Sequence, residues 1–289
     1  MITLNPQDEK TARIHAIMLG AIAPRPIALV STMGENGIPN LSPFSFYNCF
    51  GAKPPLLIFS PARRVRDNTI KHSLQNVMAN KEVVINAVTY EMVNQISLAS
   101  SEFPEGINEF EKSGLTAIPS VCVKPFRVKE SPVQFECMVK DIIVTGTEGG
   151  AGNLVICEIM LIHVDEKVLN EAGKIDPFKI DLVARMGDDW YCRANGNSLF
   201  EVEKPHTKIG IGVDAMPIEI RMSKILSGND LGKLGNIEQL PDSKEVEIYK
   251  ALHLQSLEQI QNEDHKHQYA KTLLSEGKTE DAWKVLLMK

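Results

Sequence analysis

Two long segments of β-type residues, separated by a short glycine-rich stretch, constrain the fold of this chain more than any other feature. The first is VQFECMVKDIIVTG, starting at Val133, and the second is NLVICEIMLIHV, starting at Asn153. Since only TEGGAG separates them, a long antiparallel hairpin is predicted. A phosphate-binding loop would carry a lysine and open a helix, whereas this stretch precedes a strand. The hairpin therefore indicates a mainly antiparallel β protein.

Shorter strands and helices are predicted on the N-terminal side of this hairpin. PIALVSTMGENGIPNLSPFSF reads as strand, turn and strand, while PPLLIFSP and EVVINAV read as further short strands. Helices are predicted within DEKTARIHAIMLG, DNTIKHSLQNVMAN and EMVNQISLASS, with Asp67 or Asn68 capping the second one. Short links and the lack of regular βαβ alternation favour a closed or split barrel over a doubly wound parallel sheet.

The character of the sequence changes after about Pro205, where helix-type patterns replace β-type patterns. Thr279 could cap a last helix that carries Trp283, Leu286 and Leu287 on one face. We therefore predict a β domain over residues 1–204 and a C-terminal helical extension over residues 205–289.

Charge and composition exclude several classes of protein. The 289 residues carry a formal net charge of −6, and the basic residues are dispersed, so binding to nucleic acid or to an anionic membrane is not expected. No apolar run approaches the roughly 18 to 20 residues that span a bilayer. The start, MITLNPQDEK, lacks the apolar segment of a signal peptide. Five cysteines without a C-x-x-C pair indicate neither a disulfide framework nor a zinc site. A reducing cytoplasm is the predicted location.

Familiar catalytic motifs are missing from the sequence. There is no G-x-S-x-G elbow and no H-E-x-x-H pair, and GIGVDAMP lacks the βαβ context of a dinucleotide fingerprint. His265 and His267 are two residues apart, so on a helix they face different directions and cannot share a metal. His163 is predicted to be a strand-end residue rather than a chemical group.

Three segments instead place hydroxyl or arginine side chains at strand ends or at a helix start. They are APRPIALVST (Ala23–Thr32), NLSPFSFYN (Asn40–Asn48) and SPARRVRDNT (Ser60–Thr69). Arg64, Arg66 and the backbone N–H groups around Asp67–Thr69 could hold a phosphate, although the Asp67 carboxylate would compete with an anion. From composition alone, surface arginines and turn serines explain the same residues.

These segments resemble the flavin reductase-like family of FMN-binding split barrels, which includes flavoredoxins and NAD(P)H:flavin oxidoreductases. The similar features are RPIALVST, GENGIPNLSPFSFYN, PPLLIFSP and RRVRDNT, followed in order by EFPEGINEFEKSGLT, ESPVQFEC and ARMGDDWYCR. Together they cover roughly residues 10 to 200. The last stretch is usually richer in glycine in this family, and Asp188 and Asp189 depart from that pattern.

The resemblance implies a homodimer with FMN near the subunit interface, and it assigns residues to the cofactor. Ser42, Ser45 and Phe46 would contact the ring and the ribityl chain, with Ser31 and Thr32 nearby on the neighbouring strand. The ribityl and phosphate end would be surrounded by Ser60, Arg64, Asp67 and Thr69. Arg25 and Asn48 are further candidates. Arg185, Trp190 or Tyr191 would lie towards the flavin or the partner subunit.

The implied activity is hydride transfer from NADH or NADPH to N5 of the flavin, followed by transfer of electrons to free flavin, iron or a partner protein. Such chemistry depends on positioning and on exclusion of water, so the absence of a catalytic triad is expected. Two alternatives remain open at this point. One is an FMN-binding electron carrier or store with little turnover, and the other is an interaction module led by the helical tail.

Overall fold

The computed structural model describes residues 1–202, 204–205 and 208–288. The chain divides into two compact units, Met1–Phe200 and Glu201–Lys289. The predicted boundary after residue 204 falls a few residues beyond this division. Each unit has its own buried core, as described below.

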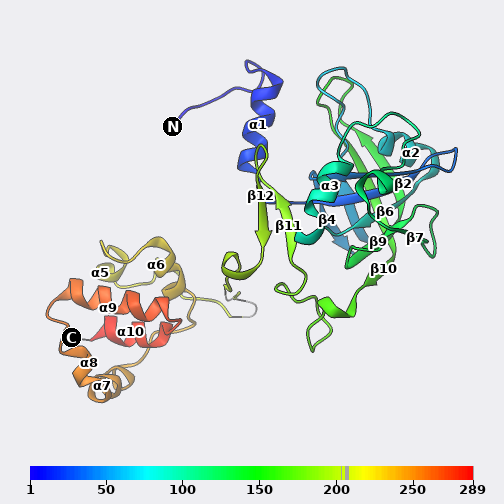
Figure 1. Ribbon diagram of the computed structural model, residues 1–289. Helices are drawn as coiled ribbons and strands as arrows, with labels where there is room; N and C mark the ends of the chain where they lie inside the picture. The colour runs from blue at the N-terminus through cyan, green and yellow to red at the C-terminus, as the bar shows by residue number, and fades with distance from the viewer. Residues whose placement is uncertain (203, 206–207, 289) are drawn as a thin grey trace. The chain divides into compact units, whose positions relative to one another are not determined.

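A seven-stranded antiparallel sheet forms the centre of the first unit, with the strand order β3-β2-β6-β9-β10-β5-β4 (Figure 1). The predicted hairpin is confirmed as its two longest strands, which pair along their whole length with two register shifts. The predicted mainly β fold is also confirmed. The strands are β2 (Ala28–Met33), β3 (Pro39–Phe44), β4 (Tyr47–Ala52), β5 (Pro55–Phe59), β6 (Glu82–Asn86), β9 (Val133–Val144) and β10 (Asn153–Val164).

The two edge strands of this sheet, β3 and β4, are consecutive in the chain. Only Ser45 and Phe46 lie between them, and three residue steps span at most about 11 Å. The sheet must therefore curl until its edges approach each other at this link. Within the described residues no strand pairs with either outer edge, so the sheet stays open along a seam between β3 and β4. A closed barrel, one of the two predicted architectures, is therefore wrong.

The inside of the curled sheet holds the main core of the first unit. Alternate residues of each strand point inward, and the rings of Phe44 and Phe59 meet there with centroids 5.4 Å apart. Cys137 and Cys157 belong to the same core, where burial raises the pKa of the Cys157 thiol to about 12. These two cysteines act as small apolar residues.

Three helices, α2 (His72–Asn80), α3 (Val93–Ala99) and α4 (Glu109–Ser113), pack against β2 or β3. Leu74 and Val77 are the buried apolar side chains of α2. The predicted cap of this helix is wrong, because Lys71 occupies the N-cap position and makes no side-chain capping bond. Asp67 instead accepts hydrogen bonds from the backbone N–H (3.0 Å) and the hydroxyl (2.6 Å) of Thr69, which makes a turn before the helix.

A second sheet and the first helix complete this unit. The sheet has the order β1-β11-β12, and a separate pair is formed by β7 and β8. Helix α1 (Thr11–Ala21) is confirmed, but none of its residues is buried, and even the apolar Ile17 and Met18 are exposed. The remaining elements are β1 (Arg25–Pro26), β7 (Ala117–Ile118), β8 (Arg127–Val128), β11 (Leu182–Arg185), β12 (Tyr191–Ala194), η1 (Tyr90–Met92), η2 (Glu166–Val168) and η3 (Gly196–Ser198).

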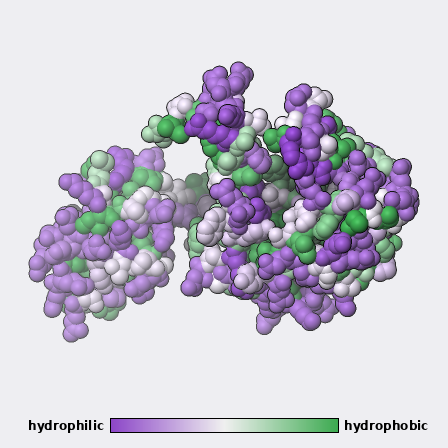
Figure 2. Space-filling view, turned by 45° about the horizontal axis from the view of Figure 1, so that its top comes forward, coloured by the Kyte–Doolittle hydropathy of each residue, from purple (hydrophilic) through white to green (hydrophobic). Residues whose placement is uncertain are grey.

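The second unit is helical in its described residues, as predicted. Trp283 is fully buried in its core and donates its indole N–H to the Leu234 carbonyl at 2.9 Å. Thr279 is the first residue of the last helix, but its predicted role as the cap is wrong, because the N-cap residue is Lys278. Hydrophilic side chains predominate on the face drawn in Figure 2. The helices are α5 (Ile218–Arg221), α6 (Gly228–Gly235), α7 (Ser243–Leu252), α8 (Leu254–Leu257), α9 (Glu263–Ser275) and α10 (Thr279–Leu287).

Candidate functional site

The Ser45–Phe46 link at the seam of the sheet contacts three other parts of the first unit. The Phe46 carbonyl accepts a hydrogen bond of 2.8 Å from the backbone N–H of Ser60, just after β5. Arg25 Nε lies 3.5 Å from the hydroxyl of Ser45, which is the outer limit of a hydrogen bond. The ring of His15, on α1, meets Phe46 edge to face with centroids 6.1 Å apart. The link is therefore the point at which the predicted segments converge.

The loop that follows β5 rests on the glycine-rich turn of the long hairpin. The Ser60 hydroxyl accepts a hydrogen bond from the backbone N–H of Asn153 at 3.2 Å. A Cβ atom at Gly149 would lie only 3.1 Å from the carbonyl oxygens of Arg64 and Val65. The turn needs glycine there because the loop backbone packs directly against it. The glycine-rich turn between β9 and β10 thus positions the candidate phosphate loop.

Arginines of this loop are held by internal partners. Arg64 donates from Nη1 to the Thr69 hydroxyl at 2.8 Å, and its Nε pairs with Glu102 at 3.1 Å. Arg66 pairs with the other oxygen of the same Glu102 carboxylate at 2.7 Å. The hydrogen bonds from Thr69 lower the pKa of Asp67 to about 2, so Asp67 is ionised at neutral pH. Arg64, Asp67 and Thr69, which the resemblance assigned to the ribityl and phosphate end, therefore form one hydrogen-bonded unit.

Lys71 is a cation of this site that the sequence analysis missed. It is half-buried, with Nζ 4.9 Å from the centre of the Phe44 ring. Burial and the nearby Arg64 lower the pKa of its ammonium group. Within the described residues its ammonium group has neither a hydrogen bond nor an ion pair, and Lys71 stands directly before the uncapped start of α2. A lysine immediately after RRVRDNTI was the available signal.

Arg25 is buried, and its guanidinium is used inside the protein. It donates to the carbonyl oxygens of Leu19, Ile22 (2.6 Å) and Met186 (2.7 Å). Burial and the neighbouring Arg185 lower its pKa. Arg25 thus joins the end of α1 to the hairpin of β11 and β12.

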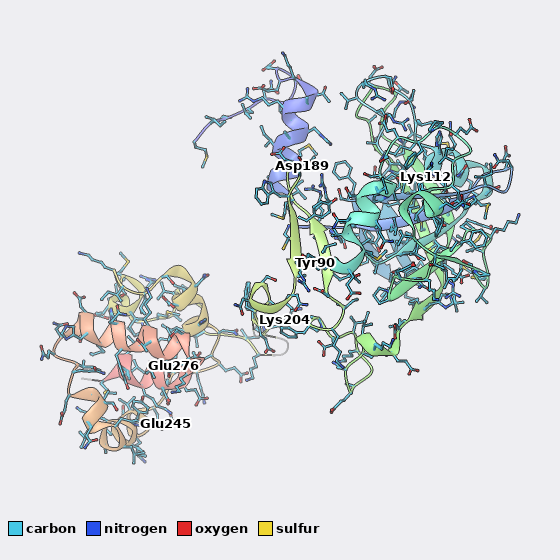
Figure 3. All side chains as sticks on the ribbon, in the orientation of Figure 1. Tyr90, Lys112, Asp189, Lys204, Glu245 and Glu276 are labelled. Atoms are coloured by element: carbon cyan, nitrogen blue, oxygen red, sulfur yellow. The ribbon has the colours of Figure 1, made fainter. Side chains whose placement is uncertain are left out.

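The β11–β12 hairpin carries the other late candidates. Arg185 lies over the ring of Tyr191 at 4.7 Å and donates to the Asp188 carbonyl at 2.7 Å. Trp190 is exposed at the turn. Figure 3 places Asp189 at the same turn, beside the last part of α1. A Cβ atom at Gly187 would lie 3.3 Å from the Cα atom of Gly20 in α1, which agrees with this position. These residues lie next to Arg25 and, through it, close to Ser45.

Ser31 and Thr32 lie on opposite sides of β2. The Thr32 hydroxyl interacts with Asn40 (3.3 Å) and accepts a hydrogen bond from Asn76 on α2 (3.0 Å). The Ser31 hydroxyl is buried and has no hydrogen-bond partner among the described residues. Its cross-strand neighbour is Leu41, which belongs to the core under α3 and α4. The two hydroxyls therefore cannot face one ligand from the same side of the strand.

Two further candidates make no side-chain hydrogen bond to the others within the part of the chain that the structure describes. Ser42 is half-buried on β3, opposite Val30, whose side chain is in the main core. Asn48 is exposed on the edge strand β4, where its side-chain oxygen accepts a hydrogen bond of 2.8 Å from the next backbone N–H. Their predicted roles depend on a ligand that reaches them.

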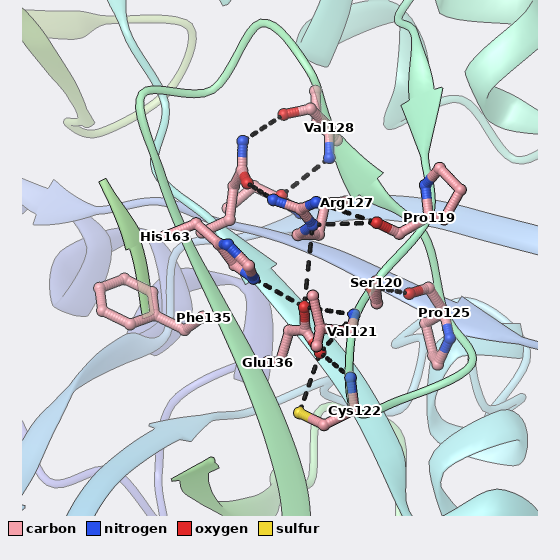
Figure 4. Close-up of polar contacts among 12 residues, drawn as sticks. Pro119, Ser120, Val121, Cys122, Pro125, Arg127, Val128, Phe135, Glu136 and His163 are labelled. Atoms are coloured by element: carbon pink, nitrogen blue, oxygen red, sulfur yellow. Dashed lines mark hydrogen bonds and ion pairs between the residues drawn. The ribbon is translucent and has the colours of Figure 1, made fainter. Parts of the chain in front are cut away.

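A buried carboxylate elsewhere in the sheet gathers histidine, arginine and cysteine around it (Figure 4). Both oxygens of Glu136 accept hydrogen bonds, including one from the Cys122 thiol at 2.9 Å, and His163 Nε2 lies 2.7 Å from Oε1. Burial and the adjacent carboxylate raise the pKa of Cys122 to about 11. Because Glu136 separates the histidine from the thiol, the imidazole cannot activate Cys122 as a nucleophile. This cluster fixes the segment around Val121 onto the sheet, and His163 takes a structural place near the end of β10.

Two kinds of site are missing from the described part of the chain. No group of three or more histidine, cysteine, aspartate or glutamate side chains there could hold a metal ion. None of the described helices has the length and apolar character needed to cross a membrane.

Comparison with known proteins places this fold in a class. Residues 19–178 match the model of the flavin reductase like domain, and the chain belongs to the flavin reductase-like family. An uncharacterized protein of Aquifex aeolicus (strain VF5) is 36% identical over 189 residues, which is 65% of this chain and 94% of that protein.

Solved structures show the same similarity over nearly their whole length. Nitrilotriacetate monooxygenase component B from Bacillus cereus has a TM-score of 0.65 at 26% identity, covering 70% of this chain and 98% of that one. A protein assigned as a flavin reductase with a split barrel domain, from Shewanella frigidimarina NCIMB 400, has a TM-score of 0.60 at 25% identity, covering 71% and 100%. The resemblance read from the sequence motifs is therefore confirmed at the level of the family.

Proposed function

We propose that this protein is an FMN-dependent oxidoreductase that accepts a hydride from NADH or NADPH in a split barrel. The observation that carries the proposal is Lys71, a half-buried ammonium without an ion pair, at the uncapped start of α2 and near Arg64. A helix start with free N–H groups, beside an ammonium that has no ion pair, is suited to a phosphate group. The family membership makes a flavin phosphate the natural candidate.

The residues at the seam fit the other parts of FMN. The aromatic ring of Phe46 would supply an apolar wall, and Ser45 and Ser60 would supply hydroxyls. Arg64, Lys71 and Thr69 would hold the phosphate, while Asp67 positions Thr69 through the two hydrogen bonds that it accepts.

When bound, FMN would supply the two-electron acceptor, since a hydride adds to N5 of its ring. The protein contributes orientation and exclusion of water. Helix α1 lies over Phe46 through His15, and Arg25 fixes the end of this helix by its bonds to Leu19 and Ile22. No side chain has to act as an acid or base in such a transfer.

We further propose that the working form is a homodimer with FMN near its interface. The edge strand β4 is exposed along most of its length, and Phe50 on it is 62% exposed. Met160 on β10 is 54% exposed, and Ile143 on β9 is also exposed. Exposed apolar side chains on neighbouring parts of one sheet are typical of a surface that a partner covers.

We also propose a cytoplasmic location for the protein. Its five cysteines are free, which is typical of a reducing compartment.

The test of this function is the absorbance spectrum of the purified protein, followed by anaerobic addition of NADH or NADPH. We expect a flavin spectrum, FMN on release, and bleaching by at least one nucleotide. If the protein holds a flavin that neither nucleotide bleaches, the reductase hypothesis is wrong and the electron-carrier hypothesis takes its place. A colourless protein that takes up no FMN would leave only the interaction module. The same assay with free flavin, iron or a protein as acceptor would identify the final electron acceptor.

Arg64→Ala tests the phosphate assignment. We expect FMN affinity to fall about tenfold, in the range of a lost charge-assisted hydrogen bond, while riboflavin affinity stays the same because riboflavin has no phosphate. Arg221→Ala, in the second unit, is the matched control and should change neither. An equal loss for both flavins in Arg64→Ala would show that the residue acts on the fold and not on the phosphate.

A further inference from the structure

The second unit contains a cavity of about 410 Å³ that the proposed function does not use. It is lined by the end of α7, by α8, by the start of α9 and by the end of α10. Its volume is within the range of small-molecule sites, about 300 to 1,000 Å³. The cavity also lies outside the residues that match the flavin reductase like domain, so family membership does not explain it.

Helix α8 forms one wall of this cavity, although none of its residues is buried. Leu254 is 61% exposed and Leu257 is half-buried, and both line the cavity. Among the described elements, α8 packs mainly on α7. Apolar side chains of a short helix are normally covered by another element of the fold. An apolar molecule in the cavity would provide the cover that these two leucines lack.

The inner wall of the cavity belongs to the core of the second unit. Val285 is fully buried in that core, and Ile260 and Met288 are half-buried against it. The neighbouring Trp283 is fully buried and held by its hydrogen bond to the Leu234 carbonyl. Because a packed core moves little, this wall is formed before any ligand arrives. A preformed wall lowers the entropic cost of binding.

Hydrogen-bond donors lie at the other end of the lining. The side chain of Lys266 is only 13% exposed, and its Nζ donates to Glu263 at 2.6 Å and to the Met288 carbonyl at 2.8 Å. An ammonium group has three donors, so one N–H is left within the part of the chain that is described. Asn262 uses its side-chain oxygen for the backbone N–H of His265 at 2.9 Å, and its NH₂ group has no partner there. A ligand can therefore place a hydrogen-bond acceptor at this end.

The charges around the cavity cancel. Two lysines, Lys250 and Lys266, and two glutamates, Glu258 and Glu263, line it among the described residues. A ligand carboxylate would compete with Glu263 for Lys266, and a ligand ammonium would compete with Lys266 for Glu263. An uncharged ligand leaves this ion pair intact and does not lose the hydration of a charged group.

We propose that this cavity binds an uncharged, mainly apolar small molecule that carries a carbonyl group at one end. The apolar body lies between the leucines of α8 and Val285, and the carbonyl oxygen accepts from Lys266 or from the NH₂ group of Asn262. The inference goes beyond the proposed function and does not depend on it, since no residue assigned to FMN takes part.

The experiment titrates 2-octanone, octanoate and octylammonium into the full-length protein and follows the leucine and methionine methyl groups by NMR. The three probes have the same chain length and differ in the charge of the head group. We expect 2-octanone to shift the signals of Met288, Leu254 and Leu257 until they saturate. It should bind about fivefold more tightly than either charged probe, because a charged head loses its hydration in the cavity. Met222, an exposed methionine of the same unit outside the lining, is the internal reference and should not shift.

Two pairs of variants locate the site. Leu254→Ser should weaken 2-octanone about fivefold through the lost apolar contact, whereas Leu252→Ser, equally apolar and 74% exposed outside the lining, should leave the affinity unchanged. Lys266→Met should weaken 2-octanone about threefold through the lost hydrogen bond, with the exposed Lys244→Met as its control. Because Lys266 also holds the Met288 carbonyl, the unfolding temperature is measured alongside, and the leucine pair carries the test if it falls.

Several outcomes would overturn the inference. The absence of saturable shifts at Met288 and Leu254 would do so, as would equal shifts at Met222, which would show that the probes adhere to any exposed apolar surface. Tighter binding of octanoate or octylammonium than of 2-octanone would refute an uncharged ligand. Equal effects of Leu254→Ser and Leu252→Ser would refute the location. None of these results bears on FMN binding, so the failure of either proposal can be recognised by itself.

Discussion

Replacement of Glu136 by glutamine should destabilise the first unit strongly. Glu136 is fully buried, and it accepts hydrogen bonds from the backbone N–H groups of Val121 and Cys122 and from the Cys122 thiol (Figure 4). Arg127 is 3.7 Å from the same carboxylate. Glutamine has the same shape, but its NH₂ group would face these donors and could accept nothing from them.

The size of the effect follows from the carboxyl group itself. Burial would raise its pKa, but the hydrogen bonds from Cys122, Val121 and His163 bring the pKa down from 4.5 to about 2. A fall of this size on folding contributes about 3 kcal/mol to the free energy of unfolding at neutral pH. Because the folded pKa is the lower one, this contribution is complete above about pH 5 and disappears as the pH falls towards 2. An unpaired buried N–H adds to the loss, so we expect about 3 to 5 kcal/mol for Glu136→Gln.

The assay has to separate the first unit from the second. Amide hydrogen exchange does this, because Val121 and Cys122 report directly on the bonds to Glu136. We expect much faster exchange at both amides in Glu136→Gln at pH 7, with a smaller difference from the native protein as the pH falls below 5. Urea unfolding of both proteins gives the accompanying loss of stability.

Glu130→Gln is the matched control, since this exposed carboxylate also accepts a backbone hydrogen bond, from Thr116 at 3.0 Å. An exposed substitution of this kind should change stability by no more than about 0.5 kcal/mol. Equal losses in the two variants, or unchanged exchange at Val121 and Cys122, would refute the reasoning that the buried carboxylate anchors this segment.

Three further predictions concern the loop after β5. Glu102→Gln removes the shared partner of the two arginines and should strengthen FMN binding a few-fold, with riboflavin as the unaffected control; weaker FMN binding would contradict the idea of competition between Glu102 and phosphate. Lys71→Met should weaken FMN about three- to tenfold without lowering the unfolding temperature, because the ammonium has no ion pair to lose. Gly149→Ala should push on the backbone at Arg64 and lower FMN affinity, whereas Gly232→Ala, with no atom within 4 Å of its Cβ, should leave the affinity as it was.

The strands and most helices of this protein were predictable because their signals are local. Alternating β-type residues and a glycine-rich turn were enough for the long hairpin, and helical spacing was enough for α2 and α3. The helix start at α2 was not predictable in the same way. Aspartate is a favoured N-cap residue, yet the carboxylate of Asp67 makes a turn with Thr69 instead. The helix begins five residues later, at His72. Two local uses of one side chain compete there, and sequence spacing does not rank them.

The strand order could not be predicted from the sequence, because it depends on pairing between distant segments. Nothing local shows that β3 and β4, two residues apart, form opposite edges of one sheet. The same limit applies to Arg25. As a sequence position it resembled a ligand residue, but it donates to the Met186 carbonyl, 161 residues away. Only the folded chain shows that its guanidinium is already used, whereas Lys71, unremarked in the sequence, has its charge free for a ligand.

The neighbouring hydroxyls of Ser31 and Thr32 on β2 show how strand geometry corrects an assignment that the family resemblance made. The resemblance assigned Ser31 and Thr32 together, but a period of two puts adjacent residues on opposite faces. The strand register decides which face each residue occupies. Thr32 faces Asn40 and Asn76, whereas Ser31 faces the core under α3. A flavin at the seam would therefore meet hydroxyls from the Ser45–Phe46 link and from Ser60, not both hydroxyls of β2. The unpaired Ser31 hydroxyl, which costs about 1 to 3 kcal/mol when buried, then needs a reason other than contact with the ring.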